Sequence, residues 1–307
     1  MTNKAELEPI DAEIVDAEIV DEPLLAPDEE GVYEGIPDHV YHGDTNSLSS
    51  SGARKILSTN PAKFRYGQLN NRKPTKAFDL GHAAHTLVLG EGPELREIPE
   101  KVLASNGAVS TKEAKTFIAE ARAAGAVPLK PDEYKQVHEM ADQLRAHPLA
   151  SLLFTSGAAE LSLYHRDRET GVMIRTRPDW LPDRKSGRLL ITDYKTAVDA
   201  GPKAFRKSMF DYGYFQQHPW YVDAVAELGI DDDPAFLFVV QEKTAPYQVV
   251  IHEIDAEDVE LGRQLNRQAI DLFAQCQQSG HWPGPPAQVH RASLSGWARN
   301  EIEETLQ

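Results

Sequence analysis

The chain has 307 residues, and 41% of them are hydrophobic, which is enough to bury a sizeable core in one large domain or two small ones. The net charge is −16, but eleven acids and one lysine lie in residues 1–30, so the overall charge does not exclude a local basic groove for nucleic acid. The single cysteine, Cys276, excludes an intrachain disulfide and a cysteine-built zinc or iron–sulfur centre.

Residues 1–30 contain the direct repeat DAEIVDAEIV, many acids and no aromatic residue. This composition predicts a disordered acidic tail, with residues 31–307 forming one folded domain. The Ile-Val pairs of the repeat could instead dock on a partner. No apolar run approaches the roughly 20 residues of a transmembrane helix, and the start of the chain lacks the apolar core of a signal peptide. We therefore expect a cytoplasmic protein without membrane contact.

The first half of the chain reads as helical. A short helix follows the serine-rich stretch 46–51, a compact helix covers 77–90, and two more cover 112–124 and 131–153.

The second half mixes strands and helices. Strands are predicted over residues 158–167, 171–181, 188–196, 234–242 and 247–254, with RETG as a hairpin turn between the first two. A helical region over 202–228 is expected to kink at Pro219. A helix over 256–279 has Asp255 as its N-cap, and a short helix could close the chain. This order predicts an α/β fold, with a central mixed sheet flanked by helices and a helical N-terminal part.

Charged residues interrupt the apolar strands in RPDWLPDRKSGRLLITDYKTA, residues 177–197. Asp179 is expected late in one strand, and Asp193 and Lys195 at the end of the next, where residues two apart face the same side. Two carboxylates suit Mg²⁺ or Mn²⁺, and a neighbouring lysine can stabilise a charged transition state. The pattern therefore indicates phosphodiester hydrolysis, whereas the alternative is a surface turn with a weak ion pair.

These residues also carry a family resemblance. PDW…ITDYKT is similar to the PD-(D/E)XK nuclease motif, with Asp in the middle acidic position. Over most of residues 32–245, an ordered series of blocks resembles the nuclease domain of exonuclease VIII, the RecE-type phage recombination exonuclease of the RecB-like branch. The blocks are SLSSSGARKILSTNPAKFRY, KPTKAFDLGHAAHTLVLG, AAELSLY, RPDWL and LLITDYKTA.

The resemblance implies a site with two divalent ions, Mg²⁺ or Mn²⁺. Lys195 is then the catalytic lysine. The implied metal ligands are His85, which closes a G-x-x-x-H spacing from Gly81, the carboxylates of Asp179 and Asp193, the carbonyl of Tyr194, and Glu160. His82, one turn away, is the alternative histidine, and a hydrogen-bonded core histidine is the alternative role.

The block QQHPWY resembles the Q-x-x-x-Y signature of the RecB-like branch. Gln217 and Tyr221 share a helix face and could position a DNA phosphate or the nucleophile. Gln216 is the alternative glutamine, and core packing is the alternative role for the pair.

A basic and aromatic segment is expected to contact DNA phosphates. Its bases are Arg54, Lys55, Lys63, Arg65, Arg72, Lys73 and Lys76. Further bases near the motif are Arg175, Arg177, Lys203, Arg206 and Lys207.

By resemblance, the chain is expected to be a metal-dependent exonuclease on double-stranded DNA ends. It would degrade the 5′-ended strand and leave a 3′ strand for an annealing recombinase, as a ring-shaped homo-oligomer in a bacterial or phage-infected cell. The alternatives are an endonuclease or repair nuclease with the same core, and a non-catalytic DNA-binding scaffold. There is no Walker A motif, so no ATP motor is expected.

Overall fold

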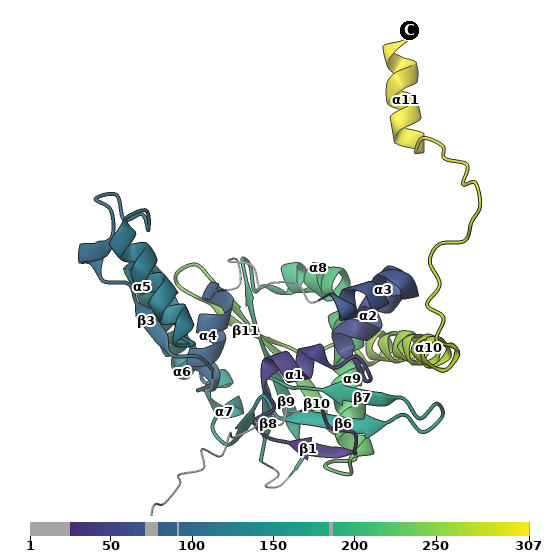
Figure 1. The fold of residues 1–307 in the computed structure, drawn as a ribbon, viewed down its shortest axis with the longest axis horizontal. Coiled ribbons are helices and arrows are strands. Elements are labelled where there is room, and N and C mark those ends of the chain that lie inside the picture. Colours follow the sequence, from purple (N-terminus) through teal and green to yellow (C-terminus); the bar gives the residue numbers. More distant parts are fainter. Residues whose placement is uncertain (1–24, 71–78, 91, 184–186, 307) are drawn as a thin grey trace, which may run out of the picture.

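The computed structural model describes residues 25–70, 79–90, 92–183 and 187–306. Figure 1 shows two sheets at the centre, with helices on both sides of them. In the described part of the chain, no helix is long and apolar enough to cross a membrane.

The main sheet has five strands in the order β11-β10-β9-β8-β5. They are β11 (Val249–His252), β10 (Ala235–Glu242), β9 (Leu190–Ala197), β8 (Trp180–Pro182) and β5 (Gly157–Ala159). The β9–β10 pair is parallel, and the other pairs are antiparallel. The predicted α/β fold with a central mixed sheet is therefore confirmed.

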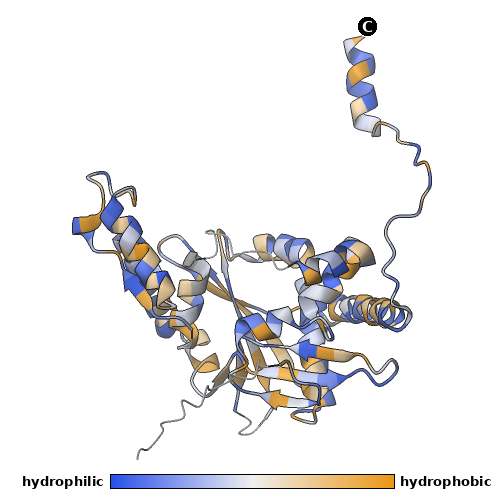
Figure 2. Ribbon diagram, in the orientation of Figure 1, coloured by the Kyte–Doolittle hydropathy of each residue, from blue (hydrophilic) through white to orange (hydrophobic). Residues whose placement is uncertain are grey.

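Two layers of helices bury the faces of this sheet. One layer contains α8 (Pro202–Tyr212) and α9 (Tyr214–Glu227), and the other contains α4 (Asp79–Leu89) and α6 (Pro131–Ala146). On β9, Ile191 packs with the α8–α9 layer and Tyr194 with the α4–α6 layer. Because side chains alternate along a strand, the apolar run of β9 serves both cores. Figure 2 shows the hydrophobic colour gathered in these central strands.

A second sheet of four strands, in the order β1-β6-β7-β2, lies beside the first. Its strands are β1 (Gly31–Tyr33), β6 (Ser162–Arg166), β7 (Met173–Thr176) and β2 (Leu48–Ser49). Strands β6 and β7 form an antiparallel hairpin around the RETG turn, as predicted. Helices α2 (Ser50–Ser58), α3 (Pro61–Leu69) and α10 (Ala256–Ser279) share its core. The predicted N-cap of α10 is confirmed, since Asp255 accepts from the Glu257 N–H at 3.0 Å.

The remaining elements lie at the edges of the body. They are α1 (Asp38–Gly43), β3 (Leu95–Glu97), η2 (Glu100–Val102), α5 (Lys112–Ala123), β4 (Val127–Leu129), α7 (Ala150–Leu153) and α11 (Gly296–Thr305). In Figure 1, α11 lies away from the body on an extended segment, and none of its described residues is buried.

The structure corrects the predicted elements at several points. The region 202–228 breaks at Gly213, in the left-handed region at φ 67°, rather than at Pro219, which lies inside α9. The predicted helix 131–153 is two helices, α6 and α7. Each of the two predicted strands before the motif is divided between the two sheets, as β5 and β6 and as β7 and β8.

The acidic tail lies mostly outside the described residues, which begin at Leu25. The last residues of the tail contact the body. The Asp28 carbonyl accepts a hydrogen bond from the Arg166 guanidinium at 2.6 Å, and the Glu30 carboxylate accepts one from the Arg166 N–H at 2.7 Å. The boundary at residue 30 and the disorder before it stay predictions.

Candidate active site

The candidate site lies where the chain passes from one sheet to the other. Glu160 stands in the short connection from β5 to β6, and Asp179 in the connection from β7 to β8. The Glu160 N–H donates to the Asp179 carbonyl at 3.3 Å, so the two connections lie side by side. Glu160 has a φ of 56°, which is a strained conformation for a residue with a side chain. This backbone bend directs the Glu160 carboxylate toward Asp179 and α4.

Helix α4 places His85 against both carboxylates. The His85 Nε2 lies 3.2 Å from Asp179 Oδ2, and its Nδ1 lies 3.6 Å from Glu160 Oε1. One donor atom from each of the three residues lies within 4.8 Å of the others. The three predicted metal ligands His85, Asp179 and Glu160 are thus brought together. The side chain of His82, the alternative histidine, lies outside the described residues.

Strand β9 supplies Asp193 and Lys195. Asp193 lies in the middle of this strand, which corrects the sequence-based placement at its end, and Lys195 lies two residues before the last. Asp179 directly precedes β8 instead of lying late in a strand, and β8 pairs with β9 through Trp180 and Thr192. The Tyr194 N–H donates to Asp179 Oδ2 at 2.8 Å, which joins the connection before β8 to the backbone of β9.

The Asp193 carboxylate is almost fully buried and has two close partners. The ammonium group of Lys195 forms an ion pair with Asp193 Oδ1, and Gln217 on α9 donates to Oδ2 at 3.0 Å. The alternative residue, Gln216, accepts a hydrogen bond from the Asn266 side chain on its backbone carbonyl, at 2.8 Å. Within the three-residue donor cluster, Asp193 contributes no atom. The structure therefore places Asp193 beside the cluster, with its oxygens held by Lys195 and Gln217.

Burial and charge act in opposite directions on these carboxyl groups. Burial alone would raise the pKa of Asp179, but the charge of Lys195 and the hydrogen bond to His85 hold this pKa below its ordinary value. Burial, with the charge of Asp179, raises the pKa of Asp193 to about 6. Burial also raises the pKa of Glu160. A cluster of acids that repel one another in a buried place is a setting in which a cation is stabilised.

Histidine and lysine respond to the same acids. Burial opposes the charged form of His85, but the hydrogen bond and charge of Asp179, with the charge of Glu160, raise its pKa overall. Burial likewise opposes the charged form of Lys195, and the charges of Asp193 and Asp179 outweigh it and raise its pKa. Lys195 is therefore a fixed cation at neutral pH.

The donor set fits a divalent metal ion. His85, Glu160 and Asp179 offer one imidazole nitrogen and two carboxylates within 4.8 Å. Oxygen-rich sets with one imidazole suit Mg²⁺ or Mn²⁺. Asp193 and the Tyr194 carbonyl are further predicted ligands, and both residues lie next to this set; the carbonyl's role stays a prediction.

Tyr221 and Arg177 line the same cavity as Lys195. The Tyr221 hydroxyl donates to the Arg177 carbonyl at 3.2 Å, so the predicted pair Gln217 and Tyr221 faces the site from one side of α9. The Arg177 guanidinium stacks over the Tyr41 ring at 4.0 Å and donates to Asp38 at 2.8 Å. Arg177 is thus held by the protein itself, and its role in DNA binding stays a prediction.

A cavity of 610 Å³ opens onto the site. It is lined by His85, Glu160, Asp179 and Lys195, and also by the N-terminal turn of α2 with Ser49, Ser50 and Ser51. The Ser50 hydroxyl is buried, and no described residue hydrogen-bonds to it. The N–H groups of a helix N-terminus attract anions. This wall can therefore receive a phosphate group.

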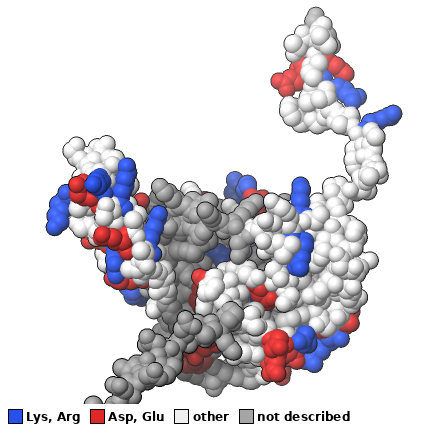
Figure 3. Space-filling view, viewed as in Figure 1, with Lys and Arg blue, Asp and Glu red and all other residues white. Residues whose placement is uncertain are grey.

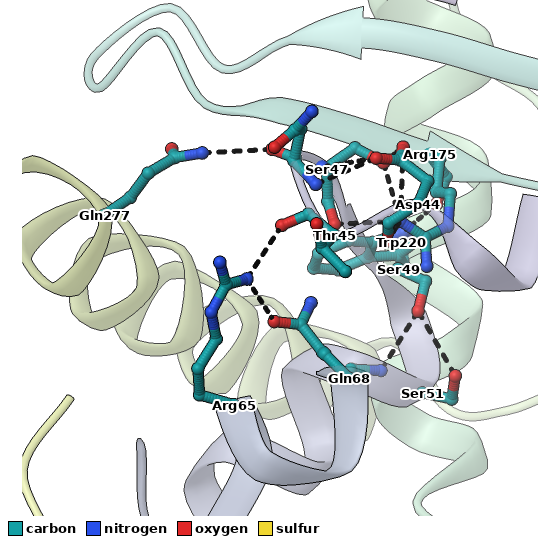
Figure 4. Close-up of polar contacts among 12 residues, drawn as sticks. Asp44, Thr45, Ser47, Ser49, Ser51, Arg65, Gln68, Arg175, Trp220 and Gln277 are labelled. Atoms are coloured by element: carbon teal, nitrogen blue, oxygen red, sulfur yellow. Dashed lines mark hydrogen bonds and ion pairs between the residues drawn. The ribbon is translucent and has the colours of Figure 1, made fainter. Parts of the chain in front are cut away.

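The loop that precedes α2 is tightly fixed, as Figure 4 shows. The buried Arg175 on β7 donates to the carbonyls of Asp44 and Ser47 at 3.0 and 2.8 Å, and to the Ser47 hydroxyl at 2.7 Å. The Asp44 carboxylate also lies 3.4 Å from Arg175. This network positions the start of α2 against the cavity. The sequence had indicated Arg175 only as part of a DNA path, and the structure shows that it holds this loop in place.

The predicted DNA-binding bases are found in different settings. Arg54 lines the cavity and donates to the Gly213 carbonyl at 3.2 Å. Lys55 and Lys63 are exposed on α2 and α3. Arg65 donates to the Thr45 carbonyl at 3.2 Å (Figure 4) and lies over the Trp282 ring at 5.1 Å. Arg72, Lys73 and Lys76 lie outside the described residues. Figure 3 shows Lys and Arg gathered over α8 and over α2 and α3, along the upper edge of the view.

Sequence reasoning missed some residues of the site. Ser49 and Ser50 were interpreted only as helix caps, and Tyr41 and Asp38 were not interpreted as site residues at all. The run of polar residues SLSSSG before an arginine was the available signal for an anion-binding helix start. The left-handed backbone of Glu160 had no signal in the sequence.

Comparison with known proteins places this geometry in a class. The fold is that of a PDDEXK-like domain. The chain belongs to the family described as "PDDEXK-like domain of unknown function (DUF3799)", whose family model matches residues 49–291. No curated protein matches the chain.

A solved structure supports the same fold. A crystal structure described as that of a "Putative exonuclease" from Eubacterium rectale matches with a TM-score of 0.54 at 11% identity, over 86% of this chain and 97% of that chain. A structure described as SSO0001 matches at 14% identity over 64% of this chain and 85% of that chain, and its TM-score of 0.27 carries no argument.

Proposed function

We propose that the protein is a divalent-metal-dependent exonuclease acting on the ends of double-stranded DNA. The observation that carries the proposal is the convergence of His85, Glu160, Asp179 and Lys195 on one cavity, at the point where the chain changes sheets. A metal ion held there would neutralise charge on a phosphate and activate a water molecule. The description of the Eubacterium rectale structure supports the exonuclease over other nuclease types.

The chain's own residues have distinct roles in this proposal. His85, Glu160 and Asp179 would hold the metal, and Asp193 lies beside this set, paired with Lys195. Lys195 lies beside them in the cavity, where its fixed positive charge stabilises the charge that develops on the scissile phosphate. Gln217 holds the Asp193 carboxylate at 3.0 Å, and Asp193 in turn orients Lys195. The serine-rich start of α2 and Arg54 receive the DNA backbone.

The finer assignment rests on the resemblance to RecE-type exonucleases. We propose degradation from 5′ to 3′, which leaves a 3′ single strand for an annealing recombinase. We further propose two bound metal ions, a ring-shaped homo-oligomer that encloses DNA, and a cytoplasmic location. The order of the sequence blocks along residues 32–245 is what supports these points.

Digestion of linear and of covalently closed circular duplex in Mg²⁺ tests the proposal. We expect nucleotide release from the linear substrate, none from the circle, and loss of the release in EDTA. Cleavage of the closed circle would assign an endonuclease instead. Binding of DNA without cleavage in either Mg²⁺ or Mn²⁺ would assign a non-catalytic scaffold.

A further inference from the structure

Helix α8 presents an aromatic and basic surface that packing does not explain. The helix is anchored by Phe205, which is buried and stacks on His252 at 4.0 Å. By contrast, Phe210 is 78% exposed and Tyr212 is 64% exposed. Large aromatic side chains are costly to leave in water, and clusters of them at a surface mark a place of interaction.

The face of α8 that carries Phe210 is positively charged, whereas Tyr212 lies at the C-terminal end of the helix. Lys203, Arg206 and Phe210 are exposed and recur at helical spacing, so they lie along one face of α8. Lys207 is exposed beside them and pairs with Asp211. Figure 3 shows Lys and Arg atoms over α8, at the upper edge of the view. The charge favours a polyanion, and the exposed rings favour a partner with flat apolar faces.

A chain of rings joins this surface to the candidate site. The Lys195 ammonium lies 5.8 Å from the centre of the Tyr214 ring, and the Tyr214 ring lies 5.7 Å from the ring of Tyr212. Between the two tyrosines, the Gly213 carbonyl accepts from Arg54 at 3.2 Å. The C-terminal end of α8 therefore lies next to two residues that line the cavity, Lys195 and Arg54.

We propose that α8 binds an unpaired DNA strand at the mouth of the active site. Phe210 and Tyr212 stack on its bases, while Lys203 and Arg206 contact its phosphates. Unpaired bases have free faces for stacking on aromatic side chains, whereas the bases of a duplex are stacked on each other. The proposal builds on the proposed function, because an exonuclease on duplex ends produces such a strand beside its active site.

Binding measurements in EDTA separate this proposal from catalysis. The probe is a fluorescent oligothymidylate, and its dissociation constant is measured by anisotropy over a range of salt concentrations. Phe210→Ala and Tyr212→Ala should each weaken binding about 5- to 150-fold, the range for one stacked base. Trp297→Ala is the matched control, because Trp297 is an equally exposed aromatic residue (73%) on α11, away from the site, and it should bind as the wild type does.

Two further variants identify the kind of contact. Phe210→Leu keeps an apolar side chain but loses the ring, so it should bind the oligothymidylate as weakly as Phe210→Ala. The double variant Lys203→Ala/Arg206→Ala should reduce the slope of log affinity against log salt by about 1.4, whereas the aromatic variants should leave the slope unchanged.

The inference is overturned if the aromatic variants bind the oligothymidylate normally, or if Phe210→Leu restores binding. It is also overturned if light scattering shows that Phe210→Ala changes the oligomeric state, because the surface would then join copies of the chain. A protein that shows α8-dependent binding without cleaving any DNA would contradict the proposed function alone. Normal cleavage with α8-independent binding would contradict this inference alone.

Discussion

At the scale of single residues, His85 decides whether a metal ion or a proton occupies the site. Both ring nitrogens face carboxylates, at 3.2 Å from Asp179 and 3.6 Å from Glu160. These acids raise the pKa of His85 against the opposing effect of burial. A ligand histidine must lose its proton to bind a metal, so proton and metal compete for this side chain.

Metal affinity should therefore rise with pH until the raised pKa of His85 is passed. Below that pKa, Mn²⁺ affinity measured by calorimetry should fall about tenfold per pH unit, as expected for one displaced proton. His85→Ala should bind Mn²⁺ weakly and without this steep dependence. His138→Ala is the control, because His138 lies on α6 with its Nδ1 at 2.8 Å from the Tyr134 carbonyl. The Mn²⁺ affinity of this variant should depend on pH as that of the wild type does. If His85→Ala keeps both the affinity and the pH dependence, His82 is the better ligand candidate.

Glu160 combines backbone strain with a functional side chain. Its φ of 56° is costly for glutamate and free of cost for glycine. Glu160→Gly should therefore raise the free energy of unfolding by about 1 kcal/mol while it weakens Mn²⁺ binding. Glu160→Gln keeps the strained backbone and should weaken metal binding without the gain in stability. Urea unfolding measures the change in stability, and calorimetry measures Mn²⁺ binding. A Glu160→Gly protein that is less stable than the wild type would show that the Glu160 backbone is not strained.

At the scale of elements, α9 and α10 approach so closely that only glycine fits between them. Pro219 has no N–H, so it cannot donate the helix hydrogen bond to the Phe215 carbonyl one turn earlier. Gly262 on α10 lies against that carbonyl. A Cβ on Gly262 would overlap it and would lie 3.0 Å from the Cα of Gln216. This contact sets the position of α9, which carries Gln217 and Tyr221 into the site.

Gly262→Ala should lower the free energy of unfolding by about 1–3 kcal/mol or more, because backbone must move to admit the methyl group. It should also reduce nuclease rate by displacing Gln217. Gly43→Ala is the control, since its added methyl group meets nothing within 4 Å, and it should change stability by less than about 0.5 kcal/mol. Equal unfolding midpoints for the two variants in urea would show that α9 and α10 are less tightly packed than described.

Local signals explain which elements the sequence could predict. The β6–β7 hairpin and α10 were predicted because RETG and Asp255 act within a few residues of themselves. The break at Gly213 was missed because a glycine inside an apolar helical pattern is ambiguous, and Pro219 was the stronger local breaker. The passage from β5 to β6 was missed because AAELSLY contains no turn residue, and the bend is set by pairing with two different sheets.

The candidate site, too, could be predicted only where its features depend on residues close together in the sequence. The face shared by Asp193 and Lys195 followed from strand periodicity, and the resemblance supplied His85, Asp179 and Glu160. In the structure, Gln217 and Lys195 hold the Asp193 carboxylate. The contact with Gln217 depends on how α9 packs on β9, and no local sequence pattern specifies this packing.

At the scale of the whole molecule, the last residues of the predicted tail contact the body. The Asp28 carbonyl and Glu30 carboxylate bond to Arg166, next to the pairing of β1 with β6. Residues before these contacts have the composition of a tail, so the fold and the site should not require them.

Deletion of residues 1–24 should leave the unfolding midpoint and the nuclease rate unchanged. Deletion of residues 1–30 removes the partners of Arg166 and should lower stability by about 1 kcal/mol, with the rate retained. Thermal unfolding and nucleotide release distinguish the two truncations. Insoluble or inactive protein after the shorter deletion would place the tail within the fold.

The central claim is that the cavity at the junction of the two sheets is a metal-dependent nuclease site. Its most direct test is nucleotide release from a linear duplex in Mg²⁺ by the wild type, by Lys195→Ala and by Asp193→Ala, with duplex binding measured in EDTA. The account predicts that both variants lose at least about 100-fold in rate, since preorganised charge of this kind contributes roughly 3–4 kcal/mol, while binding is retained. Turnover near the wild-type rate in either variant would contradict it.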